Sequence, residues 1–183
     1  MDTQNQSSFQ QRQEFFTKQK LQDSVNTFCK WRSYHEAQRF SFFCRPAIEH
    51  LSRKDAQWLA SKNYSDRTKV SILLALGQDD EKSREMAPDK RNQRIFGALA
   101  LATAATTTAT VCSSRSIWPT ILMGLATVGL LTKWAYHKGK YESKHADQAH
   151  SRVAWDAITD KDPDLKHALT RLAPHILRAK TNA

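Results

Sequence analysis

Two apolar runs without a charged residue, residues 95–114 and 116–132, lie next to each other and are separated only by Arg115. An α-helix rises about 1.5 Å per residue, so a run of about 18 to 20 residues spans a hydrocarbon core of about 30 Å. Two such helices joined by a short turn fold back antiparallel. The sequence therefore predicts an all-α integral membrane protein. Its two transmembrane helices (95–112 and 117–136) form a hairpin with a turn at 113–116.

A water-soluble helix bundle, in which both runs are core helices, is the alternative interpretation. A buried core helix of this length is expected to have a few charged residues near its middle. Neither run has one, and the length of each run suits a bilayer. We therefore favour lipid, rather than folded polypeptide, as the surroundings of both helices.

The predicted hairpin (95–136) divides the rest of the chain into polar parts. Residues 1–77 are expected to form a small helical cytosolic domain, followed by a charged linker at 78–94. Residues 137–183 are expected to form juxtamembrane and amphipathic C-terminal helices, which are also cytosolic. The chain would thus display two helical tails beside one membrane.

Basic residues are concentrated at the two polar ends of the predicted hairpin. They are Lys82, Arg84, Lys90, Arg91 and Arg94 before it, and Lys133, Lys138, Lys140 and Lys144 after it. The turn has only Arg115. Because short cytoplasmic segments are enriched in lysine and arginine, both termini are predicted to be cytoplasmic. Side chains suited to the membrane interface bracket the second span, namely Trp118, Lys133, Trp134 and Tyr136.

The first span is rich in alanine and threonine, which allow close helix packing in membranes. A ridge of small residues at four-residue spacing comprises Ala98, Ala102, Thr106 and Thr110, and Thr120 and Gly124 offer a facing groove. We expect this ridge to form the contact between the two spans or between copies of the chain. The threonine hydroxyls are expected to bond to the preceding helical turn or across the interface.

Local signals divide residues 1–77 into short helices. Pro46 is expected to interrupt one helix, and Ser52 with Asp55 resembles the capping box that begins another. A further helix is expected to end at Gly77, because glycine is common just after the last helical residue.

The second span is expected to continue as a helix to about Ile158, and a new helix is expected to start at Asp162 and Pro163. Pro174 predicts a kink in that last helix. An apolar stripe along it consists of Leu165, Leu169, Leu172 and Ile176. The stripe can close onto residues 141–158, lie on the bilayer or receive a partner helix.

Residues 28–45 interleave aromatic and basic side chains, which suits a domain core with a solvated basic face, a membrane-surface contact or nucleic acid. The domain core is the most favoured of the three and nucleic acid the least, and tethering beside a bilayer raises the weight of lipid contact. The candidate contacts to a lipid or protein partner here are Lys30, Trp31, Arg32 and Arg39. The net charge of +10 is spread over both tails, which suits the anionic lipids of a cytoplasmic leaflet.

No motif for catalysis is recognisable in the sequence. A nucleophile elbow, a phosphate-binding loop, an HExxH motif and a pair of catalytic acids are all absent. Glu142 and His145 have the spacing of half a carboxylate-bridged metal site, but the second half is missing. We therefore predict a noncatalytic protein with no catalytic, cofactor-binding or metal-ligating residues.

The leading functional interpretation is a membrane hairpin that anchors cytosolic helical tails for protein recruitment or assembly. The alternative is a membrane-remodelling or pore-type component whose small-residue spans self-associate into a homo-oligomer. In layout the chain is similar to the bilobed hydrophobic inclusion-membrane proteins that intracellular bacteria secrete. That resemblance covers residues 95–136 and includes no residue-specific motif; it implies an effector inserted as a hairpin in a host membrane.

Overall fold

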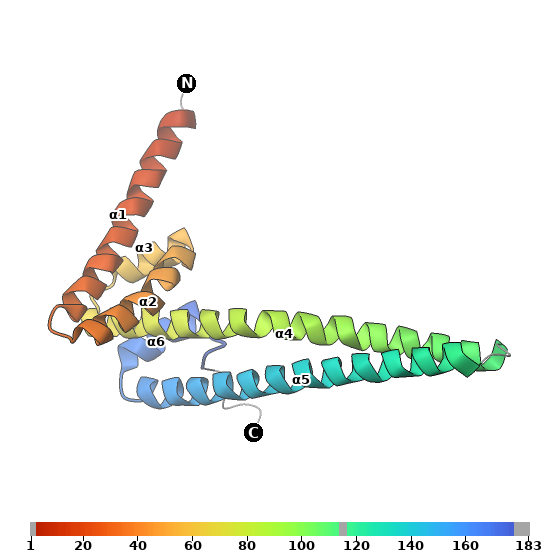
Figure 1. Cartoon of the computed structure of the whole chain (residues 1–183). Coiled ribbons are helices and arrows are strands. Elements are labelled where there is room, and N and C mark those ends of the chain that lie inside the picture. Colours follow the sequence, from red (N-terminus) through yellow and green to blue (C-terminus); the bar gives the residue numbers. More distant parts are fainter. Residues whose placement is uncertain (1–2, 114–116, 178–183) are drawn as a thin grey trace. The chain divides into compact units, whose positions relative to one another are not determined.

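The computed structural model describes residues 3–113 and 117–177, and within them every regular element is an α-helix. The helices are α1 (Thr3–Cys29), α2 (Tyr34–His50), α3 (Arg53–Ser61), α4 (Asp66–Ser113), α5 (Ile117–Thr159) and α6 (Pro163–Leu172), as Figure 1 shows. The prediction of an all-α protein is confirmed. The predicted turn at 113–116 lies outside the described residues, apart from Ser113 at the end of α4.

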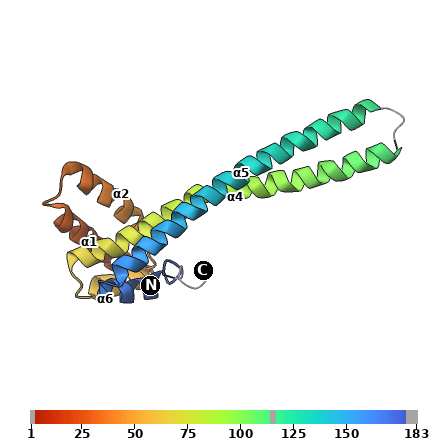
Figure 2. The same cartoon turned by 90° about the horizontal axis from the view of Figure 1, so that it is seen from below.

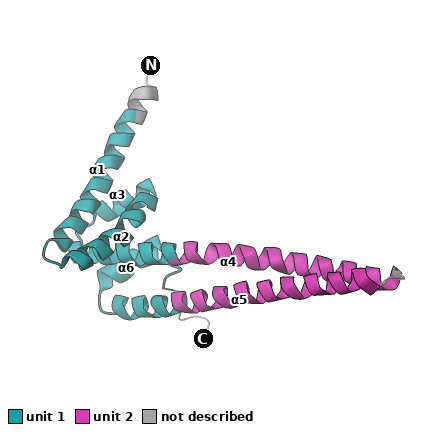
Figure 3. Ribbon diagram, in the orientation of Figure 1, with its two compact units in different colours: residues 1–81, 149–183 teal, residues 82–148 magenta. Residues whose placement is uncertain are grey.

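The chain forms two compact units, which Figure 3 distinguishes by colour. Unit 1 combines Met1–Glu81 with Ala149–Ala183, and unit 2 is Lys82–Gln148. Both long helices, α4 and α5, contribute residues to each unit. Unit 1 thus combines residues from both sides of the apolar segment, whereas residues 82–94 and 137–148 of the expected polar parts belong to unit 2.

Unit 1 has a hydrophobic core that draws on both ends of the chain. Leu21 of α1, Leu59 of α3 and Leu73 of α4 are fully buried in it, and α1 packs on α2 and α3. The apolar stripe of α6 belongs to the same core. Its members Leu165, Leu169 and Ile176 are buried, and Leu172 packs against the cluster.

The expectation that Leu165, Leu169, Leu172 and Ile176 contact lipid or a partner is therefore wrong. An amphipathic stripe indicates that a helix buries one face, but it does not say against what. Here the face joins a core built mainly from residues of α1 to α4 that lie more than 80 positions earlier, with Trp155 of α5 packed against the same core. A period-3.6 pattern does not indicate such distant partners.

The predicted helix starts are confirmed at the atomic level. The Ser52 hydroxyl accepts a hydrogen bond from the Asp55 amide at 3.2 Å and caps α3. Asp162 caps α6, since one carboxylate oxygen accepts from the amides of Asp164 and Leu165, each at 3.1 Å. The continuation of α5 to Thr159 also agrees with the expected end near Ile158.

Three predicted interruptions are wrong. Helix α2 continues through Pro46 to His50, and α4 continues through Gly77 and Pro88, so residues 78–94 are helical. Conversely, α6 ends at Leu172, before Pro174, and does not kink there. A proline inside a helix costs about 3 kcal/mol, and tertiary packing of the flanking turns can outweigh that cost.

Gly77 has a packing role. A Cβ atom built there would collide with the backbone carbonyl oxygen of Phe43 and would lie 2.8 Å from the carbonyl carbon. The α2 and α4 backbones therefore approach each other so closely that only glycine fits.

Gly77→Ala is expected to lower the free energy of unfolding of unit 1 by about 1–3 kcal/mol, because α2 must move away from α4. Thermal unfolding of the full chain, followed by circular dichroism, measures this. Gly139→Ala is the matched control, since a Cβ at that helical position meets no atom within 4 Å. The control gains helix propensity and should be neutral or stabilising. A stabilised Gly77→Ala variant would contradict the close approach.

Candidate functional site

Unit 2 has an apolar outer surface. Figures 1 and 2 show α4 and α5 side by side along it. Its exposed large apolar side chains are Ile95, Leu99, Leu101 and Val111 of α4 and Ile117, Trp118, Ile121, Leu122, Leu125, Val128, Leu131 and Tyr136 of α5. By length and composition both helices could cross a membrane. The most apolar stretch of α4 is almost entirely unburied, and that of α5 is entirely unburied. The core helix of a water-soluble protein would be mostly buried.

Most threonine hydroxyls within these apolar segments are paired inside their own helices. Each of seven threonine hydroxyls donates to the carbonyl oxygen four residues earlier, at 2.7–3.1 Å; the donors are Thr103, Thr106, Thr107, Thr108, Thr110, Thr127 and Thr132. The bonds to the preceding turn are the first of the two arrangements expected for these residues. Helices whose backbone and hydroxyl donors are paired internally meet the main requirement for contact with hydrocarbon.

The contact between α4 and α5 follows a seven-residue period. Buried and half-buried residues recur at alternating steps of three and four: Met86, Asp89, Gln93, Phe96, Ala100, Thr103, Thr107 and Thr110 on α4, and Thr120, Met123, Thr127, Leu130, Trp134, His137, Tyr141, Lys144 and Gln148 on α5. This is the spacing expected at the seam of an antiparallel coiled coil, and we call these residues the seam. The Trp134 ring packs against Gly97, where a Cβ would lie 3.1 Å from Cδ1 of Trp134.

The predicted small-residue ridge does not form that seam. Ala98, Ala102 and Thr106 are exposed, whereas Thr110 is half-buried in the seam. On α5, Thr120 and Gly124 are half-buried, and a Cβ on Gly124 would meet no atom within 4 Å. Residues four apart advance by about 40° around a helix, so a ridge with that spacing drifts off a straight seam. A contact of the ridge with a second copy remains a prediction.

The predicted interface anchors lie at the two ends of the apolar part of α5. Trp118 and Tyr136 are exposed, as is Lys133, whereas Trp134 is half-buried against Gly97. Two lysines that were predicted only as flanking positive charges also contact the aromatic rings at this end. Lys138 lies 5.2 Å from the centroid of the Trp134 ring, and Lys140 lies 4.9 Å from that of Tyr136. The four-residue spacing of each pair is the signal that could have indicated them.

Beyond the apolar part, the seam contains a buried polar network centred on Asp89. One carboxylate oxygen of Asp89 lies 2.7 Å from Lys144 Nζ, and the other lies 3.1 Å from His137 Nδ1. The His137 ring stacks on Phe96 with centroids 5.5 Å apart, and Lys144 also donates to the Glu85 carbonyl at 2.9 Å. Hydrogen bonds from Lys144 and His137 hold the pKa of Asp89 below its usual range. Sequence reasoning missed this network, because the two pairs join residues 55 and 48 positions apart.

Two further polar contacts extend this network along the seam. Lys82 Nζ donates to the Asp147 carbonyl at 3.1 Å, and the buried Gln148 amide donates to the Ser83 hydroxyl at 3.2 Å. Specific polar pairs between facing positions fix the register of a coiled coil. We infer that the network fixes the register of α4 relative to α5 next to the apolar segment.

The Asp89 network is expected to weaken in acid. Because the pKa of Asp89 is lowered in the folded protein, its contribution is complete above about pH 4 and is lost as pH falls through the lowered pKa. Asp89→Asn should cost about 1.5–3 kcal/mol at neutral pH and should remove this acid dependence. Hydrogen exchange of residues 82–96 and 137–148 as a function of pH measures both effects. Equal acid profiles for the variant and the original chain would contradict the assignment.

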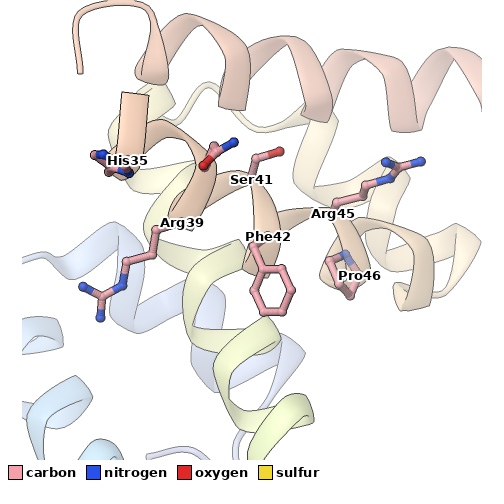
Figure 4. A pocket seen from close by; sticks show the side chains of 7 residues that line it. His35, Arg39, Ser41, Phe42, Arg45 and Pro46 are labelled. Atoms are coloured by element: carbon pink, nitrogen blue, oxygen red, sulfur yellow. The ribbon is translucent and has the colours of Figure 1, made fainter. Parts of the chain in front are cut away.

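The third predicted group of contacts lies on unit 1, around the turn that joins α1 to α2. Lys30, Trp31, Arg32 and Arg39 are all exposed there. Figure 4 shows a neighbouring open hollow on α2, lined by His35, Gln38, Arg39, Ser41, Phe42, Arg45 and Pro46. The structure thus places the basic and aromatic residues of this segment on the surface, apart from three half-buried phenylalanines, Phe28, Phe40 and Phe43.

Within residues 3–113 and 117–177, no cluster of three or more His, Cys, Asp or Glu side chains is placed to hold a metal ion. Cys44 is fully buried, and burial raises its pKa to about 12, so this thiol is a packing group and a poor nucleophile.

No family model matches the chain, and comparisons with curated proteins and with solved structures find no similar protein. The layout similarity to secreted inclusion-membrane proteins therefore remains a prediction from the sequence.

Proposed function

We propose that the chain is a noncatalytic integral membrane protein in which α4 and α5 cross a bilayer as a hairpin and unit 1 recruits or organises proteins on one side. The observation that carries the proposal is the outer surface of unit 2. Its large apolar side chains are exposed on two helices that carry no charge over residues 95–113 and 117–132. Large exposed apolar surfaces of this kind mark contact with a membrane or with another protein.

The composition of unit 1 supports a topology with both tails on the same side. Residues before the apolar segment, such as Leu73, and residues after it, such as Leu169, share one hydrophobic core. Any membrane that the segment crosses must then be crossed twice, in opposite directions. The basic residues on both flanks favour the cytoplasm as that side.

Self-association is a second candidate function. It is favoured by the exposure of Ala98, Ala102 and Thr106, which the α4–α5 seam leaves uncovered. Small residues on the outside of a transmembrane helix permit close approach of a second helix. Disulfide crosslinking between copies carrying Ala102→Cys tests this in membranes, and an exclusively monomeric product would rule it out.

Protease protection of the full chain in sealed vesicles tests the main proposal. One epitope tag is placed at each terminus, and a third is inserted next to Arg115. Both terminal tags should be cleaved together from one side, while the central tag should be protected. One protected and one cleaved terminus would end the hairpin proposal, and recovery of the chain in the carbonate-soluble fraction would end the membrane proposal.

A further inference from the structure

The corner between α1 and α2, together with the helix α2 that follows it, exposes large aromatic rings. Trp31 is 87% exposed, Tyr34 is 72% exposed and Phe42 is 62% exposed. Trp31 lies in the turn before Ser33, which caps α2, and Phe42 lies beside the hollow of Figure 4. Rings with an apolar body and a polar edge, such as Trp and Tyr, are favoured where water meets lipid.

Cationic side chains surround these rings. Lys30, Arg32, Arg39 and Arg45 are exposed, and residues 28–45 contain a single acid, Glu36. Arg32 lies 3.9 Å from Glu36, and Arg45 lies 3.4 Å from Glu49. Within the described part of the chain, Lys30 and Arg39 contact no carboxylate, and the Lys30 ammonium lies 5.4 Å from the centroid of the Trp31 ring.

We propose that this surface binds the headgroup region of an anionic bilayer. We call it the α2 patch and define it as Lys30, Trp31, Arg32, Tyr34, Arg39, Phe42 and Arg45. The aromatic rings enter the interface, and the basic side chains contact anionic headgroups. The inference rests on the proposed function, because insertion of unit 2 holds the patch near a bilayer at a high effective concentration.

The charges favour lipid over nucleic acid. Affinity for a nucleic acid comes mainly from neutralising many phosphates along a strand. Here only Lys30 and Arg39 lack a carboxylate neighbour, which is too few to follow a phosphate backbone. An aromatic anchor that is already tethered needs only a small electrostatic contribution.

Quenching of tryptophan fluorescence by brominated lipid tests the proposal. The full chain is reconstituted in nanodiscs of phosphatidylcholine alone or of phosphatidylcholine with phosphatidylserine. The fluorescence of Trp31 is obtained as the difference in fluorescence between the original chain and the Trp31→Phe variant. Trp31 should be quenched in the anionic discs and much less in the neutral ones. Added salt should reduce the quenching, because the Debye length falls to about 3 Å at 1 M.

A charge variant and a matched control isolate the patch. Each basic residue near an anionic leaflet strengthens association about fivefold. The double variant with Lys30→Gln and Arg39→Gln should therefore lower the ratio of molecules whose α2 patch is bound to the bilayer to molecules whose patch is free about 30-fold. Lys20→Gln with Lys54→Gln removes the same charge from exposed positions of α1 and α3 and should change the ratio less than twofold.

The outcomes distinguish this inference from the proposed function. Trp118 and Trp134 lie in the apolar part of α5, so their quenching in both kinds of disc reports insertion of unit 2. If Trp118 and Trp134 are quenched and Trp31 is not, binding of the α2 patch to lipid is refuted while the membrane proposal stands. If none is quenched, the membrane proposal itself fails. Binding of a labelled oligonucleotide that depends on Lys30 and Arg39, without quenching of Trp31, would assign the patch to nucleic acid and overturn the inference.

Discussion

Leu122→Arg with Leu125→Arg is expected to abolish membrane integration of the full chain. The two side chains are 65% and 66% exposed near the middle of the apolar part of α5, where the proposed function places hydrocarbon. An arginine at the centre of a transmembrane helix costs about 3 kcal/mol, so two should shift the insertion equilibrium by more than about 1000-fold. The measurement is the fraction of the chain that resists carbonate extraction.

Val153→Arg with Ile158→Arg provides the control for this pair. Both residues are exposed on the part of α5 that belongs to unit 1, and the control adds the same charge to the same helix. Its carbonate-resistant fraction should match that of the original chain. Equal losses in both variants, or full integration of the Leu122 and Leu125 variant, would mean that water or protein covers this surface.

Leu169→Asp is expected to unfold unit 1 while leaving unit 2 in the membrane. The side chain is 0% exposed and lies in the core that α6 shares with α1, α3 and α4. Truncation of a buried leucine costs about 2–5 kcal/mol, and an unpaired buried carboxylate adds to that. A domain of this size has a total stability of only about 5–15 kcal/mol. Limited proteolysis of the reconstituted chain should therefore digest unit 1 and spare residues 95–113 and 117–136.

Thr170→Asp separates the effect of burial from the effect of charge. Thr170 is the next residue along α6 and is exposed, and its hydroxyl donates only to the Lys166 carbonyl. This variant should keep the proteolysis pattern of the original chain. If Leu169→Asp were equally resistant, α6 would not be part of the core.

The sequence was most informative where the determining contacts are local. The caps at Ser52 and Asp162 depend on amides two or three residues away, so a short pattern identifies them. Gly77 shows the opposite case. Its role depends on the Phe43 backbone, which belongs to another helix, and from sequence alone a glycine at that point resembles a helix end.

The same distinction applies to the candidate site. The apolar surface could be predicted, because hydrophobicity and length are properties of a continuous segment. The seam could not, because its positions hold Asp89, Thr103, His137 and Lys144 among others, and no apolar heptad marks them. The four-residue ridge was therefore the most visible pattern, although Ala98 and Ala102 lie outside the seam.

The sharing of one core by both ends of the chain has a consequence for biogenesis. Synthesis delivers the apolar helices before α6, so Leu165, Leu169 and Ile176 leave the ribosome after them. Contacts between residues this far apart in sequence form slowly, and an unfinished core stays vulnerable to aggregation meanwhile. The apolar helices must therefore be shielded from water before unit 1 can complete its core. We expect a targeting factor or the translocon to bind the nascent chain during translation.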